Sequence, residues 1–156
     1  MAIRHIVTDE AILSQKSEPV KLKEDVQSII QDLIDTAQYN SNTEVNPMGC
    51  VGLAAIQLGY AKRICVIYMD NKWVPFINPR FKPQKNTKTY LSKERCLSID
   101  GEQETPRYLN VIVDYEYRQY LSSSGTWLSK KKNLSLNKMY SVVMQHEIDH
   151  MNGVLI

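Results

Sequence analysis

The pattern of apolar residues changes period twice along this chain, and these changes limit the folds that the sequence can adopt. Towards the N-terminus, apolar residues recur three and four positions apart, as in a helix that lays one stripe on a core. The stripe consists of Val26, Ile29, Ile30, Leu33, Ile34 and Ala37. We expect this helix to run from about Leu22 to Tyr39. The polar stretch that follows, NSNTEVNPMG, carries Asn and Pro turn signals and predicts a loop.

The middle of the chain has the composition of strands. Four runs rich in β-branched and aromatic residues are separated by turn residues; they are KRICVIYM, KWVPFINP, VIVDYEY and YLSSSGTWL. The helical period returns from Leu136 to about Met151, with Ser135 as the expected N-cap and Gly153 as the expected stop. This order predicts an α+β fold, in which mostly antiparallel strands form small sheets around the C-terminal helix.

Length and composition predict one domain over residues 1–156. No apolar stretch is long enough to cross a bilayer, and Thr8 to Glu10 break the N-terminal apolar run. We therefore expect no membrane partner and a cytoplasmic location, with an organellar origin left open. The net charge of +2 is too small to predict direct, sequence-specific nucleic acid binding, although Lys130 to Lys132 form a local basic spot. The three cysteines include no C-x-x-C pair, which suits a reducing compartment.

The segment His146-Glu147-Ile148-Asp149-His150 fits the pattern H-E-x-x-H on a helix. A spacing of four places both imidazoles on one helix face, where their nitrogens can converge on a cation. Glu147 would then lie beside the ion, free to move a proton between a water and a leaving amine. Asp149 would support a ligand or lie in solvent. Two histidines four apart can also be a surface coincidence, but the apolar run Val142 to Met144 favours a helix whose polar face is buried.

A catalytic site of this kind needs a third protein ligand. His5 lies far away in sequence, in a segment where an ordinary histidine is expected, and Cys65 lies in an apolar run that is typical of core packing. Cys96, in the polar segment KERCLSID, is the better candidate. The residues alone leave open whether Cys96 is a ligand or an ordinary loop cysteine.

Three separated segments together resemble the peptide deformylase family. That family is marked by Gly-φ-Gly-φ-Ala-Ala-x-Gln, Glu-Gly-Cys-φ-Ser and Gln-His-Glu-x-Asp-His-φ-x-Gly, in this order, where φ is an apolar residue. Here the corresponding segments are CVGLAAIQ (50–57), ERCLS (94–98) and QHEIDHMNG (145–153). The segments INP (77–79) and PR (106–107) are also similar, so the resemblance covers nearly the whole chain.

The resemblance implies a role for each matching residue. One divalent ion would be held by Cys96, His146 and His150, with Fe(II) as the expected native ion and Zn(II) or Ni(II) able to replace it. Glu147 would be the general acid and base, and Gln57 with the backbone N–H of Leu97 would hold the oxyanion. Glu94 and Arg107 would pair to hold the cysteine segment; the alternative is a surface ion pair that contributes little.

The resemblance also implies a pocket for a methionine side chain. Its wall would include Val51, Met139, Val142 and Val143, although Val142 and Val143 could also be plain helix core. Small residues such as Gly52 would let the backbone approach a formyl group closely. Three positions depart from the family pattern, namely Cys50, Ile56 and Arg95, each in place of a residue that is usually glycine, proline and glycine respectively. A long cation at position 95 would narrow the cleft or bind acidic groups of a peptide.

We therefore expect a metal-dependent enzyme that removes the N-formyl group from the N-terminal methionine of nascent polypeptides and releases formate. Two alternatives stay open: a zinc protease of the H-E-x-x-H type, and a metal or peptide binder without catalytic activity. Transient contact with the ribosome is a further expectation. Many relatives continue into a C-terminal helix that can contact the ribosome, whereas this sequence stops at Ile156. The sequence does not indicate an oligomeric state.

Overall fold

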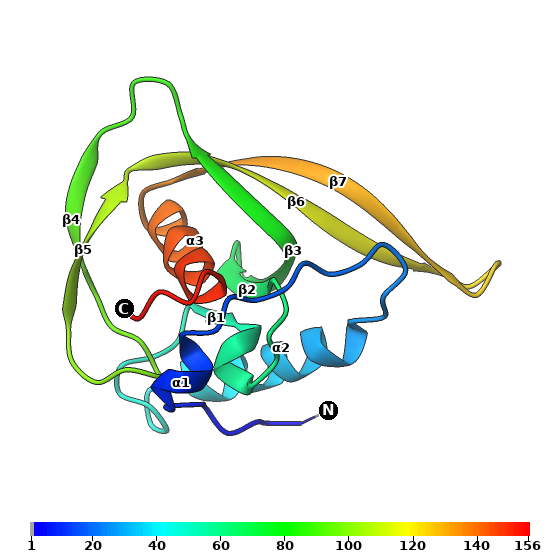
Figure 1. Ribbon diagram of the computed structural model, residues 1–156, viewed down its shortest axis with the longest axis horizontal. Coiled ribbons are helices and arrows are strands. Elements are labelled where there is room, and N and C mark those ends of the chain that lie inside the picture. The colour runs from blue at the N-terminus through cyan, green and yellow to red at the C-terminus, as the bar shows by residue number, and fades with distance from the viewer. Residues whose placement is uncertain (1) are drawn as a thin grey trace.

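The computed structural model, which describes residues 2–156, confirms the α+β fold. A five-stranded antiparallel sheet with the strand order β1-β2-β3-β6-β7 forms its centre, and a separate antiparallel pair, β4-β5, lies to one side (Figure 1). The strands are β1 Gly52–Ala54, β2 Ile64–Met69, β3 Lys72–Pro83, β4 Thr89–Glu94, β5 Gln103–Tyr108, β6 Asn110–Leu121 and β7 Thr126–Asn137. The helices are α1 Glu10–Leu13, α2 Gln27–Ser41, the 3₁₀ turn η1 Ala55–Leu58 and α3 Lys138–Met151.

The two long helices pack on opposite faces of the five-stranded sheet, because β2 is apolar on both sides. Ile64 and Val66 join the core cluster that includes Leu33 of α2. Cys65 and Ile67 alternate with them and join the cluster that includes Met144 of α3. Successive side chains of a strand point to opposite faces, so a continuous apolar run can bury both. Helix α3 thus lies between the large sheet and the β4-β5 pair, as Figure 1 shows.

Two predicted boundaries are wrong, each for a local reason. Helix α2 begins at Gln27 rather than near Leu22; Leu22 is exposed, and Val26 occupies the N-cap position. Helix α3 begins at Lys138, and Ser135 is not its N-cap but a residue of β7. The ladder between β6 and β7 continues to the pair of Asn110 with Asn137, so the backbone of this segment is held in the sheet.

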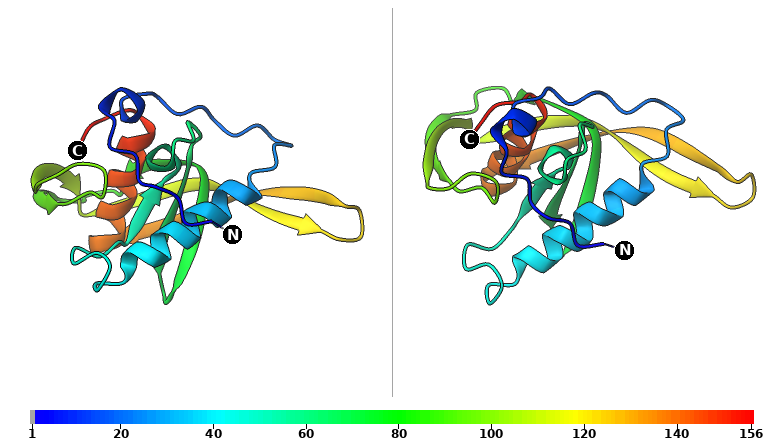
Figure 2. Two further views of the ribbon diagram at one scale, coloured as in Figure 1. Left: turned by 90° about the horizontal axis from the view of Figure 1, so that it is seen from below. Right: turned by 60° about the horizontal axis from the view of Figure 1, so that its bottom comes forward.

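The run YLSSSGTWL is not one strand but the tip of the β6-β7 hairpin. Leu121 ends β6 and Thr126 begins β7, Tyr120 faces Trp127 across the ladder, and residues 122–125 form the turn. This hairpin extends well beyond the body of the molecule (Figure 2). The predicted stop at Gly153 is confirmed: α3 ends at Met151, Asn152 is its C-cap, and Gly153 follows with a φ of 74°. No helix within residues 2–156 combines the length and the apolar character that crossing a bilayer requires.

Candidate active site

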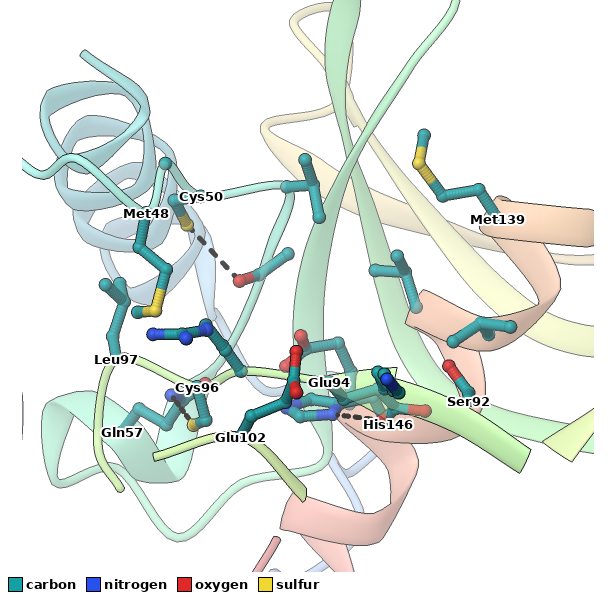
Figure 3. A pocket seen from close by; sticks show the side chains of 18 of the residues that line it. Met48, Cys50, Gln57, Ser92, Glu94, Cys96, Leu97, Glu102, Met139 and His146 are labelled. Carbon is teal, nitrogen blue, oxygen red and sulfur yellow. Dashed lines mark hydrogen bonds and ion pairs between the residues drawn. The ribbon is translucent and has the colours of Figure 1, made fainter. Parts of the chain in front are cut away.

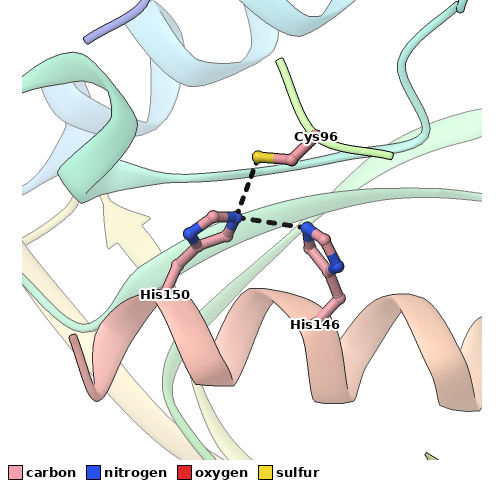
Figure 4. Close-up of side chains that lie close together, drawn as sticks. All are labelled: Cys96, His146 and His150. Atoms are coloured by element: carbon pink, nitrogen blue, oxygen red, sulfur yellow. Dashed lines mark hydrogen bonds between the residues drawn. The ribbon is translucent and has the colours of Figure 1, made fainter. Parts of the chain in front are cut away.

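Helix α3 turns two histidines of its last two turns inward. His146 and His150 are both buried, and their Nε2 atoms lie 3.2 Å apart (Figure 4). The Nδ1 of His146 lies 2.7 Å from Oε1 of Glu94. A carboxylate can only accept, so this Nδ1 carries the hydrogen and the Nε2 of neutral His146 presents its lone pair to the centre of the cluster.

Cys96 completes the cluster from a different part of the chain. It lies in the segment between β4 and β5, residues 95–102, which we call the Cys96 loop. Its Sγ lies 3.3 Å from Nε2 of His150. One donor atom from each of Cys96, His146 and His150 lies within 4.8 Å of the other two, and all three side chains are buried. His5, by contrast, is exposed, and Cys65 is packed in the core.

The chemistry of this cluster fits one divalent cation. Burial lowers the pKa of His150 to about 3, and repulsion from His146 acts in the same direction. Burial also opposes the protonation of His146, but hydrogen bonds with Cys96 and Glu94 outweigh it and raise the pKa of His146 to about 10. The cluster therefore attracts one positive charge and rejects a second. One ion held by the sulfur and both imidazoles would satisfy all three donors.

A buried ion-pair network lies beside the three candidate metal ligands and fixes the position of His146. Arg107, on β5, is 4% exposed and donates twice to Glu94, from Nε to Oε2 and from Nη2 to Oε1, both at 2.8 Å. Its Nη1 donates to Oδ2 of Asp149 at 2.5 Å. The surface alternative for the Glu94–Arg107 pair is therefore wrong, and Asp149 is not a free solvated carboxylate. The network connects β4, β5 and α3, and it includes Glu94, the residue that orients His146.

The carboxylate of Glu94 is strongly stabilised in its charged form. Burial acts to raise its pKa, but hydrogen bonds from Arg107 and His146 outweigh burial and lower the pKa to about 2. Glu94 is therefore a fixed negative charge behind His146. Such a partner raises the basicity of a histidine ligand and fixes its ring orientation.

Glu147 lies next to the cluster but belongs to no ion pair within residues 2–156. It is 3% exposed, and its Oε2 is buried without a hydrogen-bond partner among the described residues. Burial raises the pKa of Glu147 to about 7. Buried polar atoms are rarely left unpartnered, and exceptions of this kind occur at sites that bind or react.

Gln57 reaches the cluster from the 3₁₀ turn that follows β1. Its Oε1 accepts a hydrogen bond from the backbone N of Ala54 at 3.0 Å, so its Nε2 points the other way. That Nε2 donates to Ser98 Oγ at 3.1 Å and lies 3.4 Å from Cys96 Sγ. Figure 3 shows Gln57 and Cys96 side by side, with Leu97 next along the loop. The side-chain amide of Gln57 and the backbone of the Cys96 loop at Leu97 therefore lie beside the candidate ligands.

These groups open into a pocket of about 490 Å³. All of the predicted substrate-binding positions line it, namely Val51, Gly52, Arg95, Met139, Val142 and Val143. Val142 and Val143 are largely buried, whereas Val51 and Met139 are exposed at its mouth. Sequence reasoning missed further lining residues, namely Met48, Gly49, Cys50, Tyr90, Ser92, Lys93 and Glu102. The alternation of Tyr90, Ser92 and Glu94 along β4 was the available signal, because residues two apart share one face of a strand.

The three residues that differ from the family pattern, Cys50, Ile56 and Arg95, lie in different surroundings. Cys50 lines the pocket, and its Sγ donates to the carbonyl oxygen of Gly52 at 3.3 Å. Burial raises the pKa of the Cys50 thiol to about 12, so it is held as a neutral thiol rather than as a nucleophile. Ile56 is fully buried in the core cluster on the α3 side. Arg95 is exposed at the pocket wall.

Steric room, rather than backbone conformation, explains the glycine at position 52. The other five glycines have positive φ, whereas Gly52 does not. A Cβ at position 52 would lie 2.7 Å from Glu147 Oε1 and 2.7 Å from Val143 Cγ1. The absence of a side chain therefore allows the carboxylate of Glu147 and the pocket wall to meet β1 closely.

Replacing Gly52 by alanine is expected to lower kcat by roughly tenfold or more, because the carboxylate of Glu147 must move, and to lower Tm by several degrees through overpacking. The double variant Gly52→Ala/Val143→Ala removes the apolar clash but keeps the clash with Glu147, so it should recover part of the loss in Tm but not kcat. Kinetic assays and thermal unfolding of the three proteins test this. An unchanged kcat in the single variant would contradict the role assigned to this contact.

The pocket brings three candidate metal ligands, Cys96, His146 and His150, next to the buried carboxylate of Glu147, a combination of groups that is typical of hydrolases. A family model described as polypeptide deformylase matches residues 3–156. The peptide deformylase of Clostridium beijerinckii is 38% identical over 154 residues, which are 99% of this chain and 99% of that protein.

Solved structures agree with the sequence comparison. The peptide deformylase of Legionella pneumophila has a TM-score of 0.75 at 29% identity, and the match covers 99% of this chain and 83% of that one. The enzyme from the Vibrio parahaemolyticus bacteriophage VP16T, solved in complex with actinonin, has a TM-score of 0.73 at 27% identity, over 97% and 98% of the two chains. The chain belongs to the polypeptide deformylase family and is an enzyme of that type. The comparisons do not favour a zinc protease or a binder without activity.

Proposed function

We propose that this chain removes the N-formyl group from the N-terminal methionine of newly synthesised polypeptides, in a metal-dependent hydrolysis that releases formate. The observation that carries the proposal is that the Cys96–His146–His150 cluster and the unpartnered carboxylate of Glu147 lie at one pocket. Amide hydrolysis needs both kinds of group, because the attacking water must lose a proton and the departing amine must gain one.

Cys96, His146 and His150 would hold the ion, which when bound lowers the pKa of water and polarises the formyl carbonyl. A thiolate donates more charge than a third imidazole does, so the donor set suits Fe(II) as well as Zn(II) or Ni(II). Following the family, we propose Fe(II) as the native ion. Glu94 contributes by accepting the Nδ1 hydrogen of His146, which leaves Nε2 free to be a ligand.

Glu147 moves the proton in this mechanism. Its free oxygen accepts a proton from the attacking water as the new C–O bond forms, and it returns that proton to the methionine nitrogen as the C–N bond breaks. The carbonyl oxygen becomes negative in between. The Nε2 of Gln57 and the backbone N–H of Leu97 would donate to it, and the bond from Ala54 N to Gln57 Oε1 keeps that amide oriented in advance.

The pocket suits an N-terminal methionine on an extended chain. Val142 and Val143 offer an apolar wall one turn before His146, and Met139 and Val51 extend it to the mouth. In the part of the chain that the structure describes, β1 is an outer strand of the large sheet and β4 pairs with β5 alone, so each has an unpaired edge, and both strands contribute residues to the pocket. A peptide lying between these edges could pair with backbone groups on either side, whatever its sequence.

The proposal is tested by measuring formate release from formyl-Met-Ala-Ser with anaerobically purified, iron-loaded protein. We expect one formate for each free amino terminus produced, and we expect chelation of the metal to abolish the reaction. Full metal occupancy without formate release would instead favour a binder. Cleavage of internal bonds in an unformylated peptide would favour a protease. Transient ribosome contact and a cytoplasmic location stay predictions.

A further inference from the structure

One wall of the pocket carries two cationic side chains that form no ion pair with any residue from 2 to 156. Lys93, near the end of β4, and Arg95, at the start of the Cys96 loop, both line the pocket and are both exposed. Neither forms an ion pair within residues 2–156. Glu94 lies between them in sequence, but Arg107 and His146 occupy both of its carboxylate oxygens. The wall next to the candidate ligands is therefore left with uncompensated positive charge.

Three carboxylates line this pocket. Glu94 is bound by Arg107 and His146, and Glu147 is buried, so Glu102 is the exposed one. Figure 3 shows Glu102 in the same group of side chains as Glu94 and His146. Glu102 belongs to no ion pair in the described part of the chain. Two cations and one anion thus face whatever peptide enters, and the balance favours a negative group on that peptide.

We propose that Arg95, assisted by Lys93, makes this enzyme prefer formyl-methionyl peptides with an acidic side chain in one of the two residues after the methionine. The inference rests on the proposed deformylase function. Arg95 directly precedes the candidate ligand Cys96, and an extended peptide advances only about 3.3 Å per residue. The guanidinium of Arg95 is thus close to the first residues of a bound substrate peptide. It can also bind a carboxylate in a bidentate manner, which an ammonium cannot.

The effect belongs to binding rather than to chemistry. A charge on a residue beyond the formyl group is the same before and during the reaction, so the attraction lowers KM and leaves kcat unaltered. We expect kcat/KM for formyl-Met-Glu-Ser to exceed that for formyl-Met-Gln-Ser by about fivefold, the upper range for partly exposed ion pairs. The glutamine peptide has the same shape without the charge. High salt should reduce the preference, because screening weakens exposed pairs.

Four variants test the assignment. Arg95→Gln should abolish the preference, and Arg95→Glu should reverse it in favour of formyl-Met-Lys-Ser. Glu102→Gln should increase the preference, because it removes the competing carboxylate. Lys85→Gln is the matched control: Lys85 is exposed in the turn between β3 and β4 and does not line the pocket. It removes the same unit charge as Arg95→Gln and should leave the ratio of the two kcat/KM values intact.

The outcomes separate this inference from the proposed function. If no formyl peptide releases formate, the proposed function fails. If all three peptides are processed with equal kcat/KM by the wild type, the deformylase function stands and the acidic preference is overturned. A loss of kcat on every peptide in Arg95→Gln, with the ratio unchanged, would also overturn it, because that pattern belongs to a structural role.

Discussion

Replacing Glu147 by glutamine is expected to lower the rate of formate release by roughly two to four orders of magnitude, the range for loss of a general acid–base group. Glutamine has nearly the same shape, so it fits the buried position beside Gly52 and Val143, but it cannot accept and return a proton. Steady-state assays with formyl-Met-Ala-Ser measure the rate, and metal analysis of the same samples shows whether the ion is still held. We expect full metal content, because Glu147 is not one of the three candidate ligands.

Thermal unfolding separates a catalytic role of Glu147 from a structural one. The Oε2 of Glu147 accepts no hydrogen bond from residues 2–156, and an unpartnered buried charge destabilises a fold. The neutral amide should therefore leave Tm unchanged or raise it, as occurs where activity and stability conflict. A variant that is both inactive and less stable would contradict the assignment and would indicate that Glu147 mainly supports the helix.

Replacing Arg107 by alanine is expected to lower the free energy of unfolding by about 3–5 kcal/mol, the usual result of breaking one side of a buried ion pair. Two carboxylates lose their partner at once, those of Glu94 and Asp149. Because Glu94 orients His146, metal affinity should also fall by roughly 10- to 100-fold. Urea unfolding measures the first effect and metal titration the second. Arg107→Lys should recover part of the charge but not the bidentate geometry.

Arg4 offers a matched control for this prediction. Its Nε lies 2.8 Å from Asp32 Oδ2, the same separation as in the Arg107–Glu94 pair, but its side chain is 49% exposed. Solvent screens such a pair, so Arg4→Ala should cost far less stability and should leave metal affinity unaltered. Equal losses from the two substitutions would show that burial of the Arg107 network is not what makes it important.

The elements that periodicity predicted are those with an apolar face on the main core. The stripe of α2, the double-sided run of β2 and the returning helical pattern of α3 are of this kind. Their boundaries were harder to predict, because competing backbone contacts decide them. The pairing of Asn110 with Asn137 continues β7 past Ser135, and no property of Ser135 itself indicates this.

The β4-β5 pair was missed because its inner face is polar. Its sequences TYLSKE and QETPRY show no apolar alternation, and the side chains that it buries include Ser92 and Arg107. Strand patterns are recognised by apolar residues at every second position. A strand that packs through an ion-pair network lacks that signal, although the network is what connects it to α3.

The sequence by itself determined that His146, Glu147 and His150 share one helix and that three ordered segments match one family, because helical spacing and motif order are local properties of the chain. Only the tertiary structure decided that Cys96, 54 positions before His150, meets it, that Arg107 joins Glu94 to Asp149, and that Gly52 makes room for Glu147. These contacts depend on how the two sheets pack around α3, and no short window of sequence contains both partners of such a contact.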